Sequence, residues 1–174
     1  MQRHSTTRPA DLPTPSPHPA VRPWPAEATE LLARAEQMLQ AEGPQPALDL
    51  LARSKDPSAW VVNARAVCLL RLGETERALE LFRGLVLGPV GIGMRDAPTV
   101  FKANYAAAQL LTGNLTGCIV TLGQARDEAH PSVQRLREAI RRWERGLPFW
   151  EKVRWYLGGS ARRPVELDRP GDLG

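Results

Sequence analysis

The chain has 174 residues, of which 43% are hydrophobic and 24% are charged, and its net charge is only +4. This balance is typical of one soluble globular domain. No stretch approaches the roughly 20 apolar residues of a membrane-spanning helix, and prolines interrupt every early apolar run that a secretory signal would need, so we expect a soluble, cytoplasmic protein.

The first 25 residues differ from the rest of the chain in composition. Seven of the 16 prolines fall within residues 1–25, and this stretch has almost no helical or strand periodicity. Such a backbone stays extended and mobile because it cannot bury enough apolar surface to order itself. We therefore expect a disordered, proline-rich arm at 1–25.

Residues 26–130 contain apolar side chains at spacings of three and four, which predicts a series of helices separated by glycine and proline. Asp56 and Thr75 are the predicted N-caps of two of these helices, and Gly73 can take the positive φ that closes a helix. The expected helices are Ala26–Ala41, a short one around Ala47–Leu51, one from Pro57 to about Leu72, one from Thr75 through Leu85, one from Pro98 to Gly113, and Leu115–Glu128.

Two further helices are expected after His130-Pro131. The spacing of Val133, Leu136, Ile140, Trp143 and Leu147 predicts a seventh helix, and Phe149, Trp150, Val153, Tyr156 and Leu157 predict a short eighth helix with an apolar side. Residues 131–158 are thus expected to be capping helices. Residues 159–174 lack periodicity and are expected to form a flexible tail.

The segment from Val61 to Gly88 reads as two amphipathic helices joined at Gly73, and a second segment beginning near Lys102 repeats this pattern. One helix pair has too little apolar surface to fold alone, so repeated pairs predict a stacked, all-α solenoid. Solenoids of this kind usually hold another molecule rather than transform one.

The repeated positions carry small, large and turn residues in a fixed order: Ala66, Leu69, Gly73, Ala78, Phe82 and Leu85 in one unit, and Tyr105, Ala106, Gly113, Cys118, Leu122 and Ala125 in the next. This pattern resembles the tetratricopeptide repeat, a unit of about 34 residues. The resemblance implies a right-handed solenoid of about three hairpins. It is weaker in the first unit, Arg65 stands where the family usually has leucine, and an unrelated helical array or irregular bundle remains the alternative.

Members of the tetratricopeptide family usually bind an extended peptide or a partner helix in a concave groove. By position, the resemblance places in that groove Arg34, Gln37, Asn63, Val67, Leu70, Asn104, Ala107 and Leu111. Ordinary solvated helix surface is the alternative interpretation of each. Asn104 matches one position of the family's carboxylate clamp, but Ala33 and Ala64 replace polar residues of that clamp, which argues against chaperone-tail recognition. The expected partner is another protein or peptide.

Catalytic and metal-binding patterns are not found in the sequence. His4 and His18 lie in the arm, and His130 precedes Pro131 at a helix start, where capping or simple exposure is expected. Cys68 and Cys118 lack neighbouring ligands at metal-binding spacing and are expected to be small core residues. The glycine-rich loop before Asp96 lacks the third glycine of a dinucleotide site. We therefore expect a protein that is not an enzyme and needs no cofactor or metal.

The end of the chain is basic and aromatic. Residues 131–163 hold nine basic and three acidic side chains, a net charge of +6. The main interpretation is structural: the last two helices cap the solenoid by burying Ile140, Trp143 and Trp150. The alternative function is an adaptor that docks to a membrane surface or nucleic acid through this end. Trp155 lies off the apolar side of its helix and is the candidate for an exposed contact.

Overall fold

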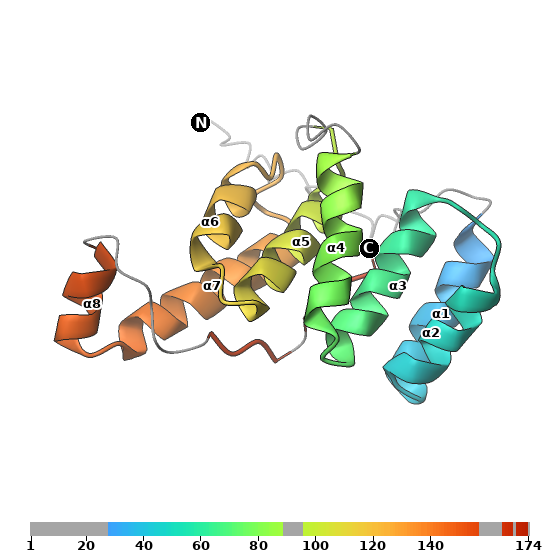
Figure 1. Ribbon diagram of the computed structural model, residues 1–174, viewed down its shortest axis with the longest axis horizontal. Helices are drawn as coiled ribbons and strands as arrows, with labels where there is room; N and C mark the ends of the chain where they lie inside the picture. The colour runs from blue at the N-terminus through green and yellow to red at the C-terminus, as the bar shows by residue number, and fades with distance from the viewer. Residues whose placement is uncertain (1–27, 89–95, 157–164, 169, 174) are drawn as a thin grey trace, which may run out of the picture.

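The computed structural model describes residues 28–88, 96–156, 165–168 and 170–173. These residues form eight α-helices and contain no strand (Figure 1). The helices span α1 Thr29–Ala41, α2 Pro44–Arg53, α3 Ala59–Arg71, α4 Thr75–Leu87, α5 Thr99–Leu111, α6 Leu115–Gly123, α7 Pro131–Gly146 and α8 Phe149–Tyr156. The all-α prediction is confirmed, while the arm expected at residues 1–25 lies outside the described residues.

From α1 to α6, each helix packs against the next along the chain, as in a helical repeat. In addition, α1 contacts α3, α3 contacts α5, and α5 contacts α7. The odd-numbered helices therefore form a continuous row, and a segment lying across this row can touch several helices at once. None of the helices in the described ranges is long and apolar enough to cross a membrane.

The turn after α3 and the turn after α5 have the same geometry. Gly73 and Gly113 both have φ of 82°. The amide of Glu74 donates to the carbonyl of Leu69 at 3.0 Å, and the amide of Asn114 donates in the same way to Gln109 at 2.7 Å. This is the Schellman closure, in which glycine takes the left-handed conformation without steric cost. Two successive hairpins thus turn by the same device, as the sequence predicts for Gly73.

The buried core includes a small side chain on each of α2, α4 and α6. Ala47, Ala78 and Cys118 are fully buried, and their size lets neighbouring helices approach closely. Larger residues such as Phe82 fill the adjacent core, and Phe82 is also fully buried. Cys68 and Cys118 are buried free thiols, which confirms their prediction as core residues.

The predicted N-caps Asp56 and Thr75 are wrong. Helix α3 begins at Ala59 and is capped by Ser58, whose Oγ accepts from the amide of Val61 at 3.4 Å, whereas Asp56 accepts from the amide of Ser58 at 2.8 Å. Thr75 donates back to the carbonyl of Gly73 at 3.3 Å and caps no amide of α4. Several polar residues precede each helix, and only the local turn decides which one caps it.

Helix α6 ends at Gly123, earlier than the expected boundary at Glu128. Downstream of the helix, the carboxylate of Asp127 accepts from the amide of Ala129 at 3.0 Å, and its carbonyl accepts from the amide of His130 at 3.3 Å. Such side-chain-to-backbone turns compete with helix formation. Ala125 lies past the end of the helix and is still buried, so apolar spacing alone does not mark the boundary.

Arg65, which departs from the repeat pattern, closes the end of α2. Its Nε and Nη2 donate to the carbonyl of Leu51 at 3.0 and 2.6 Å, and Nη2 also donates to the carbonyl of Ser54 at 2.7 Å. The last carbonyls of a helix have no partner within the helix. The arginine supplies these partners, so a polar residue is retained at a position that faces the end of the preceding hairpin.

Helices α7 and α8 differ in the burial of their apolar side chains. Helix α7 packs against α5 and buries Val133, Leu136, Ile140 and Trp143. In α8, Phe149 is 69% exposed and Trp150 is 78% exposed, so the expected burial of Trp150 is wrong. Figure 1 shows the reason: α8 lies beyond the end of α7, away from the row of helices that could cover it.

Candidate functional site

Residues 165–168 and 170–173, here called the tail segment, lie against the row of odd-numbered helices. Val165 and Leu173 are each 6% exposed. The segment is bonded to α3, α5 and α7, which differs from the flexible tail expected for residues 159–174. Residues 157–164 lie outside the described residues. The contacts come from helices distant in the sequence, so no local pattern announces them.

A pair of buried asparagines holds the backbone of the tail segment. Asn63 of α3 and Asn104 of α5 are almost fully buried, and Nδ2 of Asn104 donates to Oδ1 of Asn63 at 2.9 Å. Asn104 also donates to the carbonyl of Asp172 at 2.7 Å and accepts from its amide at 2.8 Å. Because a buried amide without partners costs free energy, the extended backbone satisfies a need of the helices themselves.

Every carbonyl from Pro170 to Leu173 accepts a hydrogen bond from a side chain. Arg71, at the end of α3, donates to Pro170 at 3.3 Å and to Gly171 at 2.9 Å. Asn63 donates to the carbonyls of Asp172 and Leu173 at 3.4 and 3.3 Å. These bonds recognise main-chain atoms, so they do not themselves depend on the side chains of the tail segment.

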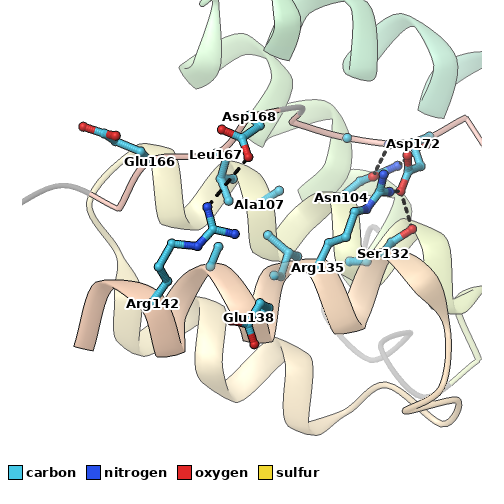
Figure 2. A pocket seen from close by; sticks show the side chains of 14 residues that line it. Asn104, Ala107, Ser132, Arg135, Glu138, Arg142, Glu166, Leu167, Asp168 and Asp172 are labelled. Atoms are coloured by element: carbon cyan, nitrogen blue, oxygen red, sulfur yellow. Dashed lines mark hydrogen bonds and ion pairs between the residues drawn. The ribbon is translucent and has the colours of Figure 1, made fainter. Parts of the chain in front are cut away.

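The carboxylate of Asp172 has its own polar subsite on α7. It accepts from Oγ of Ser132 and forms an ion pair with Arg135, as Figure 2 shows. Ser132 lies in the first turn of α7, where the helix dipole favours a negative charge. The side chains of Arg135 and Asp172 are 53% and 24% exposed, so solvent weakens the ion pair itself. The guanidinium of Arg135 can only donate, so the subsite favours an acceptor, and the buried Ser132 adds a second donor.

Gly171 is the one tail residue whose conformation and surroundings both require glycine. Its φ is +79°, and a Cβ at this position would lie 3.2 and 3.3 Å from the Cγ atoms of Val67 and 3.5 Å from Cδ2 of Leu70. A non-glycine residue would be strained by its φ and crowded by α3. The tail segment therefore passes close to α3 at Gly171.

A cavity of about 260 Å³ lies between α5, α7 and the tail segment. Ala107, Leu136 and Leu167 supply part of its apolar lining, and Arg142 lies at its edge, where its Nη1 is 3.9 Å from Oδ2 of Asp168 (Figure 2). This volume is below the usual range of about 300–1,000 Å³ for small-molecule sites.

Five of the eight residues predicted for a groove meet at this site. Asn63 and Asn104 bond to the tail, Val67 and Leu70 lie against Gly171, and Ala107 lines the cavity. The other three take no part in the hydrogen bonds or the cavity described above. Arg34 and Gln37 are exposed on α1, and Leu111 is 37% exposed near the end of α5. The backbone of Trp155 belongs to α8, but its side chain lies outside the described residues.

Sequence reasoning missed Arg71, Ser132 and Arg135. Arg71 could have been found, because it lies four residues after Val67 and eight after Asn63, on the same face of α3. Ser132 and Arg135 are three apart on α7 and share a face. Their role was hidden because α7 was interpreted as a cap and the tail as unbound.

Other titratable groups of the described chain have structural roles. Burial raises the pKa of Cys68 to about 11 and that of Cys118 to about 12, so both are neutral thiols and poor nucleophiles at neutral pH. His130 caps α7, as predicted: its Nδ1 accepts from the amide of Ser132 at 3.3 Å. Burial also lowers the pKa of Lys102, whose Nζ donates to the carbonyl of Gln124 at 3.2 Å.

Comparison with known proteins returned no relative: no family model, curated protein or solved structure matches this chain. The site is defined by its own geometry. Two buried asparagines, an arginine on the same face and a serine–arginine pair surround one extended segment.

Proposed function

We propose that this chain is a non-catalytic protein-interaction module, a right-handed solenoid of about three tetratricopeptide-like hairpins closed by α7. Its proposed binding site, here called the groove, is the face of α3, α5 and α7 that carries the tail segment. The repeated Schellman turns at Gly73 and Gly113 and the buried small residues on α2, α4 and α6 support the repeat assignment. The cytoplasmic location remains a prediction from composition.

The observation that carries this proposal is the pairing of Asn104 with both the amide and the carbonyl of Asp172. One side-chain amide can pair in this way with one residue of an extended chain, much as a neighbouring strand would. Asn63 and Arg71 extend the recognition over the adjacent residues. The chain thus displays, on its own tail, the way in which we propose it holds a segment of another protein.

A second function is favoured by one observation at the other end of the molecule. Phe149 and Trp150 are exposed and pack edge-to-face, with ring centroids 5.3 Å apart, on a helix that also carries Lys152 and Arg154. Aromatic and basic side chains together suit a membrane interface or stacked bases. The helix has only eight residues and includes Glu151, so the groove is the better supported site.

Peptide binding in solution tests the groove. The receptor is the full chain with Gly171→Val, which weakens its own tail, and the probe is a fluorescent peptide with the sequence of residues 165–174. We expect saturable binding by fluorescence anisotropy. Asn104→Ala and Arg71→Ala should each weaken binding at least about tenfold, because each removes hydrogen bonds to the peptide backbone.

The matched control is Gln134→Ala, an exposed amide on α7 outside the groove, which should leave the affinity unchanged. Raising salt from about 0.1 to about 0.5 M should change peptide affinity only a few-fold, whereas lipid or nucleic-acid binding would collapse. Absence of saturable binding would overturn the proposal. Salt-sensitive binding to anionic vesicles that Trp150→Ala removes would support the second function instead.

A further inference from the structure

The groove distinguishes the identity of three consecutive tail residues as well as their backbone. Gly171 fits because its φ of +79° disfavours other residues and because an added Cβ would crowd Val67. Asp172 fits because Ser132 and Arg135 meet its carboxylate. Leu173 is 6% exposed and belongs to the apolar core. Backbone binding alone would not require this order of glycine, carboxylate and leucine.

The acidic residues of the tail segment differ in exposure and in the partners of their carboxylates. Glu166 is exposed and points away from α7, and the side chain of Asp168 is 90% exposed, with its carboxylate 3.9 Å from Arg142 (Figure 2). Only Asp172 reaches a buried hydroxyl as well as a guanidinium. A general attraction of a basic surface for acidic chain would not single out one carboxylate, so the subsite on α7 reads one position.

We propose that the groove selects partner segments in which glycine, an acidic residue and leucine follow one another, with the glycine at a positive φ as in Gly171, and that the tail segment is an internal copy of this ligand. This inference rests on the proposed function of the groove. A partner of this kind must displace the tail segment, because both would bond to Asn63, Asn104 and Ser132.

Displacement sets the apparent affinity for the partner. A ligand that belongs to the same chain competes intramolecularly, at an effective concentration that a free partner must overcome. The affinity seen by a partner is then reduced by the fraction of molecules whose groove is open. Weakening the tail should therefore strengthen partner binding even though no contact with the partner is changed.

The first measurement compares two receptors with the labelled peptide of residues 165–174. We expect the Gly171→Val chain to bind this peptide at least about tenfold more tightly than the unaltered chain does. In nuclear magnetic resonance spectra, the chemical shift of the Asp172 amide should differ between the unaltered chain and the Gly171→Val chain. Such a shift would show that the tail has left the groove. Equal affinities of the two receptors would overturn the internal-ligand part of the proposal.

The second measurement tests recognition of the carboxylate by exchanging charges. In the Gly171→Val receptor, a peptide carrying Asp172→Lys should bind at least about tenfold more weakly than the unaltered peptide. Adding Arg135→Glu to the receptor should reverse this preference. The control is Arg141→Glu, an exposed arginine of the same helix outside the groove, which should retain the preference for the acidic peptide.

The outcomes separate the two proposals. If both peptides bind the Gly171→Val receptor equally well, the groove binds extended segments but does not select the carboxylate, and this inference is wrong. If neither peptide binds, the proposed function itself fails. Circular dichroism establishes that each receptor is folded. Because both peptides are compared on the same receptor, a defect in its folding cannot produce the difference between them.

Discussion

Helix α8 and the tail segment follow one another along the chain, and their burial is the reverse of what their composition suggests. Helix α8 exposes Phe149 and Trp150, whereas the more polar tail segment is bonded along Pro170–Leu173. The difference shows that burial here depends on a complementary surface. The row of odd-numbered helices offers buried amides that need a backbone, while α8 lies beyond the last helix that could cover it (Figure 1).

The largest effect expected from this comparison is the contrast between two tryptophans. Trp143→Ala should destabilise the fold by about 3–5 kcal/mol, because this side chain is 8% exposed and its removal leaves a cavity in the hydrophobic core. Trp150→Ala should change the free energy of unfolding by less than about 0.5 kcal/mol, since the ring is 78% exposed. Urea unfolding followed by circular dichroism measures both. Equal losses would show that α8 is packed as firmly as α7.

A pair of glycine substitutions should give effects of opposite sign. Gly171→Ala should reduce stability by about 1–2 kcal/mol, because its φ of +79° is unfavourable for alanine and its Cβ would crowd Val67. Gly84→Ala, in α4 with open space around it, should raise stability by about 0.4–1 kcal/mol. Thermal unfolding compares the two. A neutral Gly171→Ala would mean that docking of the tail segment contributes little to stability.

The last prediction concerns a buried thiol of the helical core, which serves as a reference for α8 and the tail segment. Burial raises the pKa of the Cys68 thiol to about 11, while an unfolded thiol ionises near 9.0. The native state therefore retains its proton where the unfolded state loses it, so this thiol's contribution to stability falls as the pH rises above about 9. At pH 8, iodoacetamide should alkylate Cys68 at least about a hundredfold more slowly in the folded chain than in the chain unfolded by denaturant. Rapid alkylation without unfolding would show that α3 opens locally.

Much of the secondary structure could be predicted because its signals are local. Glycine at Gly73 closes α3, proline at Pro131 begins α7, and apolar spacing marks the helices between them. The predicted caps at Asp56 and Thr75 are wrong for a different reason. Neighbouring polar side chains compete for one amide, and the turn geometry that decides between them follows no periodic pattern.

Only part of the proposed binding site could be recognised from the sequence. The resemblance to the tetratricopeptide repeat brought Asn63 and Asn104 to one face, and helical spacing could have added Arg71. The tail segment could not be found in this way, because its stabilising bonds go to side chains 40 to 110 residues away. A segment that bonds to other elements needs no periodic pattern of its own.

The sequence by itself determined the all-α class and the approximate helices, since helical periodicity extends over only a few residues. Tertiary structure alone decided that α8 would expose its aromatic rings and that Asp172 would lie between Asn104 and Ser132. The physical reason is the same in both cases. A side chain or backbone group is buried where another element supplies its contacts and hydrogen bonds, and that supply is fixed only when the helices have packed.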